Sequence, residues 1–133
     1  LTREQADKFA AEWVEAWNSH DLGRILSHYS DDFVMSSPRI AVVAEEPSGV
    51  LHGKAEVARY WEKALALAPN LHFELLSTFL GADSLAIHYK GMRGPAVEVF
   101  FFNPAGLVSK QLRIICSWLF RWRQCLPAIA SVP

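Results

Sequence analysis

The sequence has few cysteines and no long apolar run. Cys116 and Cys125 are its two cysteines, and neither lies in a C-x-x-C or Cys/His arrangement. A disulfide framework and a zinc site are therefore excluded as the basis of the fold, and we expect a reduced, cytoplasmic protein. No stretch has the length and hydropathy of a membrane span or a signal peptide, so we expect no membrane contact.

An excess of charge of one sign is also lacking. The chain has 13 basic and 14 acidic residues, a formal net charge of -1, which gives no electrostatic reason to expect nucleic acid as a partner. The five histidines show no spacing typical of metal ligands, so we expect neither a metal nor another cofactor. Acidic residues are missing beyond Glu98, whereas Lys110, Arg113, Arg121 and Arg123 follow it.

The most informative stretch that is present is residues 96–102, Ala-Val-Glu-Val-Phe-Phe-Phe. Turn signals bound it on both sides, and its β-branched and aromatic content predicts a strand. Successive side chains of a strand point to opposite faces, and both faces here are apolar, as in a central strand covered on both sides. Glu98 is the exception. A carboxylate at this position must find a partner, reach water or stay protonated.

Three helices are predicted in the first half of the chain. A capping box at residues 2–5 starts a long amphipathic helix that ends near residue 18, a short helix follows at 22–26, and a third spans 54–68. The first and third helices have aromatic faces. The chain between them is predicted to be a strand at 33–37 and then mostly loop to residue 51, with a short strand at 40–43 as the alternative.

The second half is predicted to be an antiparallel meander of strands. The strands are expected at residues 71–80, 85–90, 96–103 and 107–119, separated by short turns that contain glycine. Helices followed by an antiparallel sheet give an α+β layout. A chain of 133 residues with 51% hydrophobic residues can bury a core of its own, so we expect one such domain.

Four segments carry a family resemblance: Trp13–Asp21, Tyr29–Phe33, Leu51–Lys54 and Val97–Val108 with its Asn-Pro-Ala-Gly turn. Their order resembles the nuclear transport factor two-like superfamily, and within it the SnoaL-like group that includes ketosteroid isomerase and limonene epoxide hydrolase relatives. The resemblance implies a cone in which a curved antiparallel sheet wraps around three N-terminal helices and encloses a pocket. It implies a cone domain at residues 1–118 and leaves 119–133 as an apolar C-terminal extension.

The resemblance implies acid–base chemistry that this sequence keeps only in part. In ketosteroid isomerases a helix tyrosine and a strand acid form the oxyanion hole, and a second acid is the base. These positions fall on Trp13, Glu98 and Ser37. Indole N–H is a donor but a poor acid, and serine has no carboxylate to move a proton, so isomerisation by that mechanism is not expected. The Asp-Arg-Asp set of limonene-type hydrolases cannot be assembled either.

Glu98 and His88 are the candidate catalytic residues. In the functional interpretation Glu98 is a buried acid with a raised pKa that donates to a ligand. In the structural interpretation it pairs with a neighbour or lies at a sheet edge. A five-residue hairpin loop at Gly91–Pro95 would place His88 directly opposite Glu98, where the two could relay a proton or form a structural pair.

Large apolar residues are candidates for the pocket wall or for plain core packing. Arg39 follows the first strand and could hold an anionic group at the mouth or be a solvated loop residue. The apolar candidates for ligand binding are Trp13, Trp17, Phe33, Met35, Tyr60, Trp61, Phe100, Phe102 and Trp118, with Tyr89 beside them.

Two functions from different classes remain open. The first is a SnoaL-like protein that binds an apolar carbonyl or hydroxyl compound, as an isomerase-, cyclase- or hydrolase-type enzyme or as a binder, with Glu98 as acid. The second is a non-catalytic dimeric module with a filled cone. Either would form a homodimer through the outer sheet face, which carries Val97, Val99, Phe101, Leu112 and Ile114 or Ile115. The extension at 119–133 is expected to be docked, because its apolar residues are closely spaced.

Overall fold

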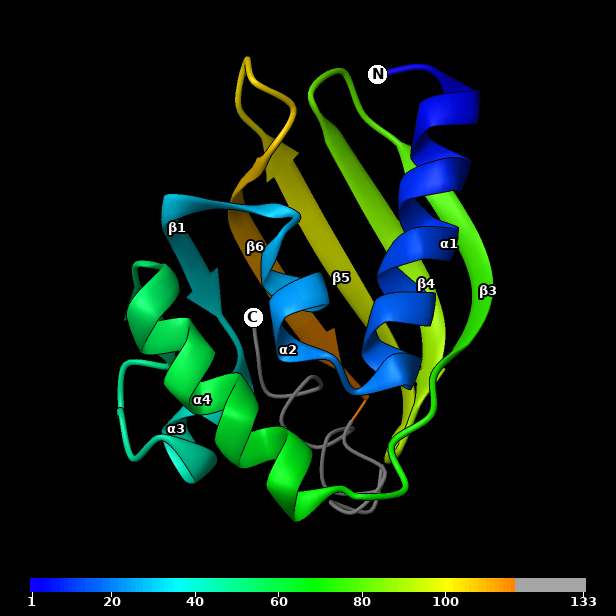
Figure 1. The fold of residues 1–133 in the computed structure, drawn as a ribbon. Coiled ribbons are helices and arrows are strands. Elements are labelled where there is room, and N and C mark those ends of the chain that lie inside the picture. Colours follow the sequence, from blue (N-terminus) through cyan, green and yellow to red (C-terminus); the bar gives the residue numbers. More distant parts are fainter. Residues whose placement is uncertain (117–133) are drawn as a thin grey trace, which may run out of the picture.

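The protein has an α+β fold in which helices cover one face of a six-stranded curved sheet (Figure 1). The computed structural model describes residues 1–116. Within them α1 (Arg3–Ser19) contacts β3, and α4 (Lys54–Leu67) contacts β1 near the opposite end of the sheet. The predicted fold class is confirmed. The extension at 119–133 and Trp118 lie outside the described residues.

The first helix begins and ends where its sequence dictates. The Thr2 hydroxyl accepts from Gln5 N while the Gln5 side chain accepts from Thr2 N, so the predicted capping box forms. His20 ends the helix in the left-handed region with φ 60°. One face of the helix is buried against the sheet, and it carries both small and aromatic side chains. They include Ala6, Ala10, Trp13, Ala16 and Trp17.

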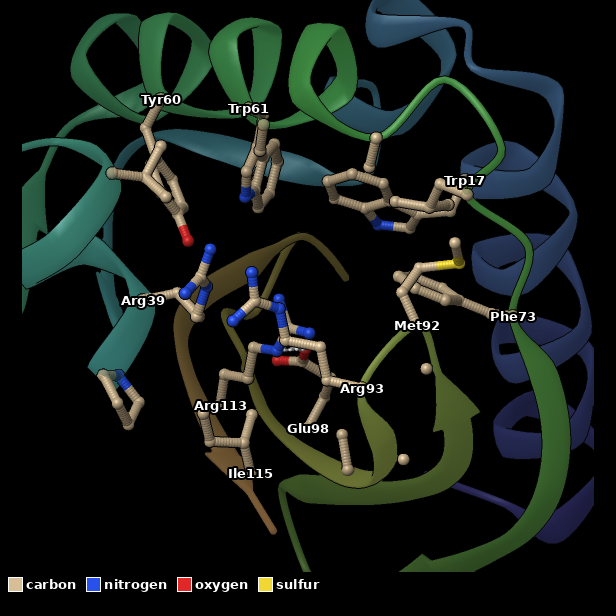
Figure 2. Close-up of a pocket in the computed structure, with 18 of the residues that line it drawn as sticks. Trp17, Arg39, Tyr60, Trp61, Phe73, Met92, Arg93, Glu98, Arg113 and Ile115 are labelled. Atoms are coloured by element: carbon tan, nitrogen blue, oxygen red, sulfur yellow. Dashed lines mark ion pairs between the residues drawn. The ribbon is translucent and has the colours of Figure 1, made fainter. Parts of the chain in front are cut away.

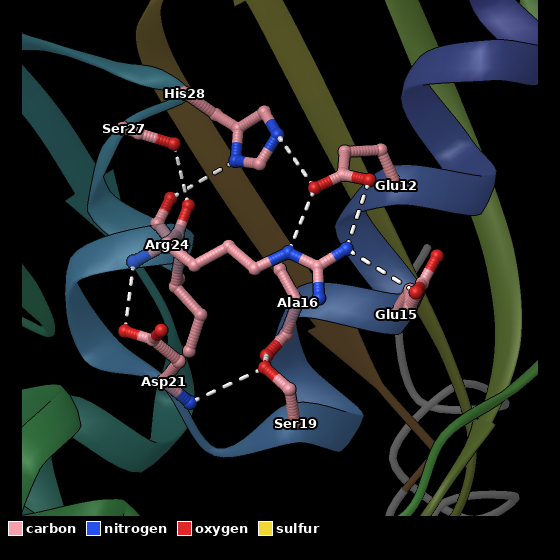
Figure 3. A network of polar contacts seen from close by, with 9 residues as sticks. Glu12, Glu15, Ala16, Ser19, Asp21, Arg24, Ser27 and His28 are labelled. Atoms are coloured by element: carbon pink, nitrogen blue, oxygen red, sulfur yellow. Dashed lines mark hydrogen bonds and ion pairs between the residues drawn. The ribbon is translucent and has the colours of Figure 1, made fainter.

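Helix α2 (Leu22–Leu26) is tied to α1 by a polar network around Arg24 (Figure 3). The guanidinium donates to both carboxylate oxygens of Glu12, at 2.9 and 3.0 Å, and lies 3.4 Å from Glu15. The side chain of Asp21 caps the helix by accepting from Arg24 N at 3.1 Å. His28 Nε2 lies 4.0 Å from Glu12 and closes the network. This region orients the two helices and lies away from the pocket described below.

The sheet has the strand order β2-β1-β6-β5-β4-β3 and is mixed rather than wholly antiparallel. The strands β3 (Glu74–Leu80), β4 (Ser84–Gly91), β5 (Gly94–Phe102) and β6 (Val108–Ile115) form the predicted antiparallel meander. However, β1 (Tyr29–Ser36) pairs with β6 in parallel and with the short β2 (Val50–His52) antiparallel. Local sequence patterns do not encode strand direction across such a long connection.

Residues 38–43 form a helix, which corrects the predicted loop or short strand. Helix α3 (Pro38–Val43) begins with Pro38 in its first turn, and the Ser37 hydroxyl accepts from Arg39 N at 3.2 Å. A serine cap followed by proline is a helix start signal, but six residues gave too short an apolar pattern to identify it. The described part of the chain therefore has four helices, and the predicted third helix is α4.

The β4–β5 hairpin has a tighter turn than predicted. Gly91 pairs with Gly94, which leaves a two-residue turn, and Glu98 stands opposite Ile87 while His88 stands opposite Val97. The predicted pairing of His88 with Glu98 is therefore wrong, because shifting the register by one residue moves a side chain to the other face. The inner face keeps Glu98 and Phe100, as predicted.

Candidate functional site

The described side chains leave a pocket of about 500 Å³ between the helices and the inner face of the sheet (Figure 2). Helices α1 and α4 contribute indole rings, α3 and the β4–β5 turn form another side, and β5 and β6 form the floor. Its walls are mainly apolar. The aromatic lining residues are Trp13, Trp17, Tyr60, Trp61 and Phe73.

Glu98 is a buried carboxyl group in the floor of this pocket, with 2% of its surface exposed. Each of its oxygens accepts one hydrogen bond from a neutral side chain. The Tyr89 hydroxyl donates to Oε1 at 2.8 Å, and Gln111 Nε2 donates to Oε2 at 2.7 Å. The residue therefore has the partners that a buried polar group needs, while its side chain still lines the cavity.

A chain of hydrogen bonds fixes the orientation of Gln111. Trp13 Nε1 donates to the Tyr29 hydroxyl at 3.0 Å, and that hydroxyl donates to Gln111 Oε1 at 2.6 Å. An indole N–H can only donate, so the Tyr29 proton must point toward Gln111, and the amide must direct its NH₂ group toward Glu98. Oε2 of Glu98 is thus held as an acceptor. A proton on Glu98 belongs on Oε1.

Arg113 completes the first set of contacts around the acid. It pairs with Glu98 in the β5–β6 register, and its Nε lies 3.5 Å from Oε1. Burial raises the pKa of Glu98, against the opposing effects of the Arg113 charge and of the hydrogen bonds from Gln111 and Tyr89. The site therefore holds an acid whose protonated form is favoured more than that of a free glutamate.

Two buried donors at the pocket lack an acceptor among residues 1–116. They are Trp17 Nε1 and Arg113 Nε, both from residues that line the cavity. Arg113 Nε faces Glu98 at ion-pair distance but outside hydrogen-bond geometry. Unsatisfied buried donors are uncommon in folded proteins, and a ligand oxygen is one group that would satisfy them.

The predicted pocket residues divide into wall and core. Trp13, Trp17, Met35, Tyr60 and Trp61 line the pocket, as does Arg39, one of the two alternatives for that residue. The predictions placed three phenylalanines there that lie outside the lining: Phe33 packs on Tyr29 and Trp61, while Phe100 and Phe102 pack on Phe9. These three rings therefore pack in the core rather than in the pocket wall.

His88 lies away from the pocket. Its Nδ1 lies 3.2 Å from the Ser77 hydroxyl on the neighbouring strand, and it is absent from the cavity lining. The Ser37 hydroxyl accepts a hydrogen bond as the N-terminal cap of α3. Neither residue can act with Glu98 in the geometry described.

Sequence reasoning missed the polar residues that β6 and the β4–β5 turn bring to the site. Arg113, Gln111 and Arg93 all line the pocket. One signal was present, because every charged residue after Glu98 is basic. The position of the Asn-Pro-Ala-Gly turn alone would not have placed Arg113 opposite Glu98, because the β5–β6 register shifts between Phe101 and Phe102.

No cluster of three or more His, Cys, Asp or Glu side chains in residues 1–116 could hold a metal ion. None of the described helices is long and apolar enough to cross a membrane.

Known families and structures resemble this chain over most of its length. The model of the SnoaL-like domain matches residues 10–108. A SnoaL-like protein of unknown function from Burkholderia thailandensis is 52% identical, with a TM-score of 0.84 over 86% of this chain and 97% of that one. No curated protein matches the sequence.

More distant structures share the fold. A candidate polyketide cyclase from Sinorhizobium meliloti is 15% identical, with a TM-score of 0.64 over 77% of this chain and 90% of that one. A candidate isomerase from Agrobacterium tumefaciens is 16% identical, with a TM-score of 0.66 over 83% and 96%. At such identities the likeness extends to the fold alone.

Proposed function

The chain belongs to the SnoaL-like domain family, and we propose that it binds an apolar, ring-containing small molecule whose carbonyl or hydroxyl oxygen contacts Glu98. The observation that carries this proposal is a buried carboxyl group in the floor of an aromatic pocket. A pocket of about 500 Å³ is within the range of roughly 300–1,000 Å³ typical of small-molecule sites. It also argues against the filled cone of the interaction-module hypothesis, as far as the described residues are concerned.

Glu98 suits the role of hydrogen-bond donor to a ligand oxygen. Gln111 holds Oε2 as an acceptor, and Tyr89 donates to Oε1, so a proton on Oε1 is free to point into the cavity. Burial raises the pKa of Glu98 and favours that protonated form. A carbonyl that accepts this proton becomes polarised, and Arg113 at 3.5 Å from Oε1 stabilises the carboxylate left behind.

The lining residues suit catalysis by a single acid rather than by a separate acid and base. Glu98 is the one carboxylate among the described lining residues, and that lining includes no histidine or lysine. Isomerase- and cyclase-type reactions, which the names of distant structural neighbours suggest, are compatible when a single acid polarises the reacting oxygen. Trp13 does not serve as a donor to ligand, because its Nε1 is bonded to Tyr29.

A ligand panel tests the proposal. Ring ketones such as 2-tetralone and ring alcohols such as 2-naphthol are added to the wild type, Glu98→Leu and the control Glu62→Leu, which changes an exposed acid of α4 outside the pocket. Leucine removes the donor, whereas a glutamine amide would still donate from the Oε1 position. Ligand-induced thermal stabilisation is expected for the wild type and the control and should be much reduced for Glu98→Leu. No stabilisation by any ligand, or stabilisation that Glu98→Leu leaves unchanged, contradicts the proposal.

A homodimer through the outer sheet face is the second part of the proposed function. Val97 stands beside Ile114, and Val99 beside Leu112, on the face opposite to Glu98. Ile114 is 56% exposed and Phe79, on the same face of β3, is 60% exposed. A second copy of this chain is the partner that would cover such a face, in an interface on the order of 1,200–2,000 Å².

A further inference from the structure

We infer that the ligand carries an oxyanion group, separate from the oxygen that contacts Glu98, and that Arg39 and Arg93 bind it. This inference rests on the proposed small-molecule function and narrows it to apolar ring compounds with a carboxylate or phosphate. The subsite lies where α3 and the β4–β5 turn meet the pocket, and Figure 2 shows the arginine side chains on that side of the cavity.

Three arginines from three separate elements converge there. Arg39 comes from the first turn of α3, Arg93 from the two-residue β4–β5 turn and Arg113 from β6. All three line the cavity; Arg39 and Arg113 are partly exposed, and Arg93 is exposed. Figure 2 also shows the Tyr60 hydroxyl directed toward Arg39. The aromatic wall of α1 and α4 forms the rest of the pocket, so the site has one cationic end and one apolar end.

The charges at this end do not balance. The described lining residues include three guanidinium groups and one carboxylate, and that carboxylate is paired with Arg113. Neither Arg39 nor Arg93 forms an ion pair with another residue of the described chain. Like charges close together in a partly desolvated site repel one another. An anionic ligand group removes that repulsion.

The same electrostatics acts on Arg39 itself. Burial lowers the pKa of Arg39, and the positive charges of Arg93 and Arg113 lower it further. The group nevertheless stays charged, as arginines do in proteins. A guanidinium is a planar fork of donors that matches the two oxygens of a carboxylate or phosphate. Two such forks beside an aromatic pocket are suited to a ring compound with an anionic substituent.

Matched acids and esters test this inference directly. The probes are 2-naphthoate, methyl 2-naphthoate and 2-naphthyl phosphate, titrated calorimetrically into the full chain at low and high salt. The variants are Arg39→Gln, Arg93→Gln and both together. Arg59→Gln is the control, because it makes the same charge change at an exposed position of α4 that does not line the pocket. Circular dichroism checks that every variant is folded.

The expected result is a preference of roughly tenfold or more for an anionic probe over the ester. The preference should fall with salt and in each single variant, and should vanish in the double variant, while Arg59→Gln keeps it. Comparison of the affinities for 2-naphthoate and 2-naphthyl phosphate then shows whether the subsite prefers a carboxylate or a phosphate. Equal binding of acid and ester, or an equal loss in Arg59→Gln, overturns the inference.

The Glu98→Leu variant separates this inference from the proposed function. If neutral ring ketones bind in a manner that depends on Glu98 but the anions gain nothing, the proposed function stands and the oxyanion subsite is rejected. If the anions bind through Arg39 and Arg93 while Glu98→Leu changes nothing, the subsite stands and the proposed role of Glu98 is rejected. If no probe binds, both are rejected.

Discussion

Gln111 donates a hydrogen bond of 2.7 Å to Oε2 of Glu98, and its direction is set by Trp13 through Tyr29. The consequence is that the two oxygens of one carboxyl group have different roles. Oε2 is fixed as an acceptor, whereas Oε1 faces a hydroxyl and a guanidinium and can hold a proton. The residues that prepare the acid thus reach it from α1, β1, β4 and β6.

Removing Gln111 should destabilise the protein strongly. Gln111→Leu leaves the Glu98 oxygen and the Tyr29 hydroxyl proton without a partner in the core, at a cost of about 1–3 kcal/mol for each group. The control Lys110→Leu changes an exposed neighbour on the same strand and should stay within about 0.5 kcal/mol. Urea unfolding measures both. Equal losses in the two variants would show that the network contributes nothing specific.

Tyr89 should tune the acidity of Glu98. Its hydroxyl donates to Oε1 at 2.8 Å and lowers the pKa of Glu98 against the larger effect of burial. Tyr89→Phe keeps the ring and removes this bond, so the titration midpoint of Glu98 should move to higher pH. Carbon-13 NMR of the glutamate carboxyls, with Glu98→Gln for assignment, follows the midpoint. A shift to lower pH would contradict the described geometry.

Stability should depend on pH through Glu98. The folded state raises the pKa of Glu98 above the ordinary 4.5, so in the window above 4.5 the folded chain keeps a proton that the unfolded chain has released. The unfolded state binds fewer protons there, and the free energy of unfolding falls as pH rises through the window. The melting temperature of the wild type minus that of Glu98→Gln should therefore decrease as pH rises from 4.5 and then level off. A difference that rises with pH would mean that the folded pKa is lowered.

The sequence predicted those parts of the site that depend on one element. Helical spacing identified Trp13, Trp17, Tyr60 and Trp61, and alternation in β5 placed Glu98 among inward-facing residues. The parts of the site that depend on the register between two strands could not be predicted from the sequence. The His88 pairing failed because the hairpin turn has two residues instead of five.

The other features that the sequence did not predict have two different physical origins. Helix α3 is six residues long, too short for periodicity to show. The parallel pairing of β1 with β6 joins segments more than 70 residues apart in sequence, and such pairing is decided by packing of the whole sheet. Arg93 and Arg113 meet Arg39 only after these long-range contacts form.

The outer sheet face should determine the oligomeric state. Ile114→Lys introduces a charge on the exposed apolar face, beside Val97, and should convert the proposed dimer to a monomer. Val42→Lys is the control, since Val42 is 66% exposed on α3, away from that face. Light scattering at micromolar concentration reads out both. A monomeric wild type would refute the dimer outright.

The most direct test of the central claim is the infrared carbonyl band of a bound ring ketone. We would record 2-tetralone labelled with carbon-13 at the carbonyl, bound to the wild type, Glu98→Leu and Glu62→Leu. We expect the band to move to lower frequency in the wild type and in Glu62→Leu, because a protonated Glu98 donates to the carbonyl oxygen, and most of this shift to be lost in Glu98→Leu, which has no donor at that position. A band at the frequency found in an apolar solvent, or an equal shift in all three proteins, would contradict the claim that Glu98 is the acid of this pocket.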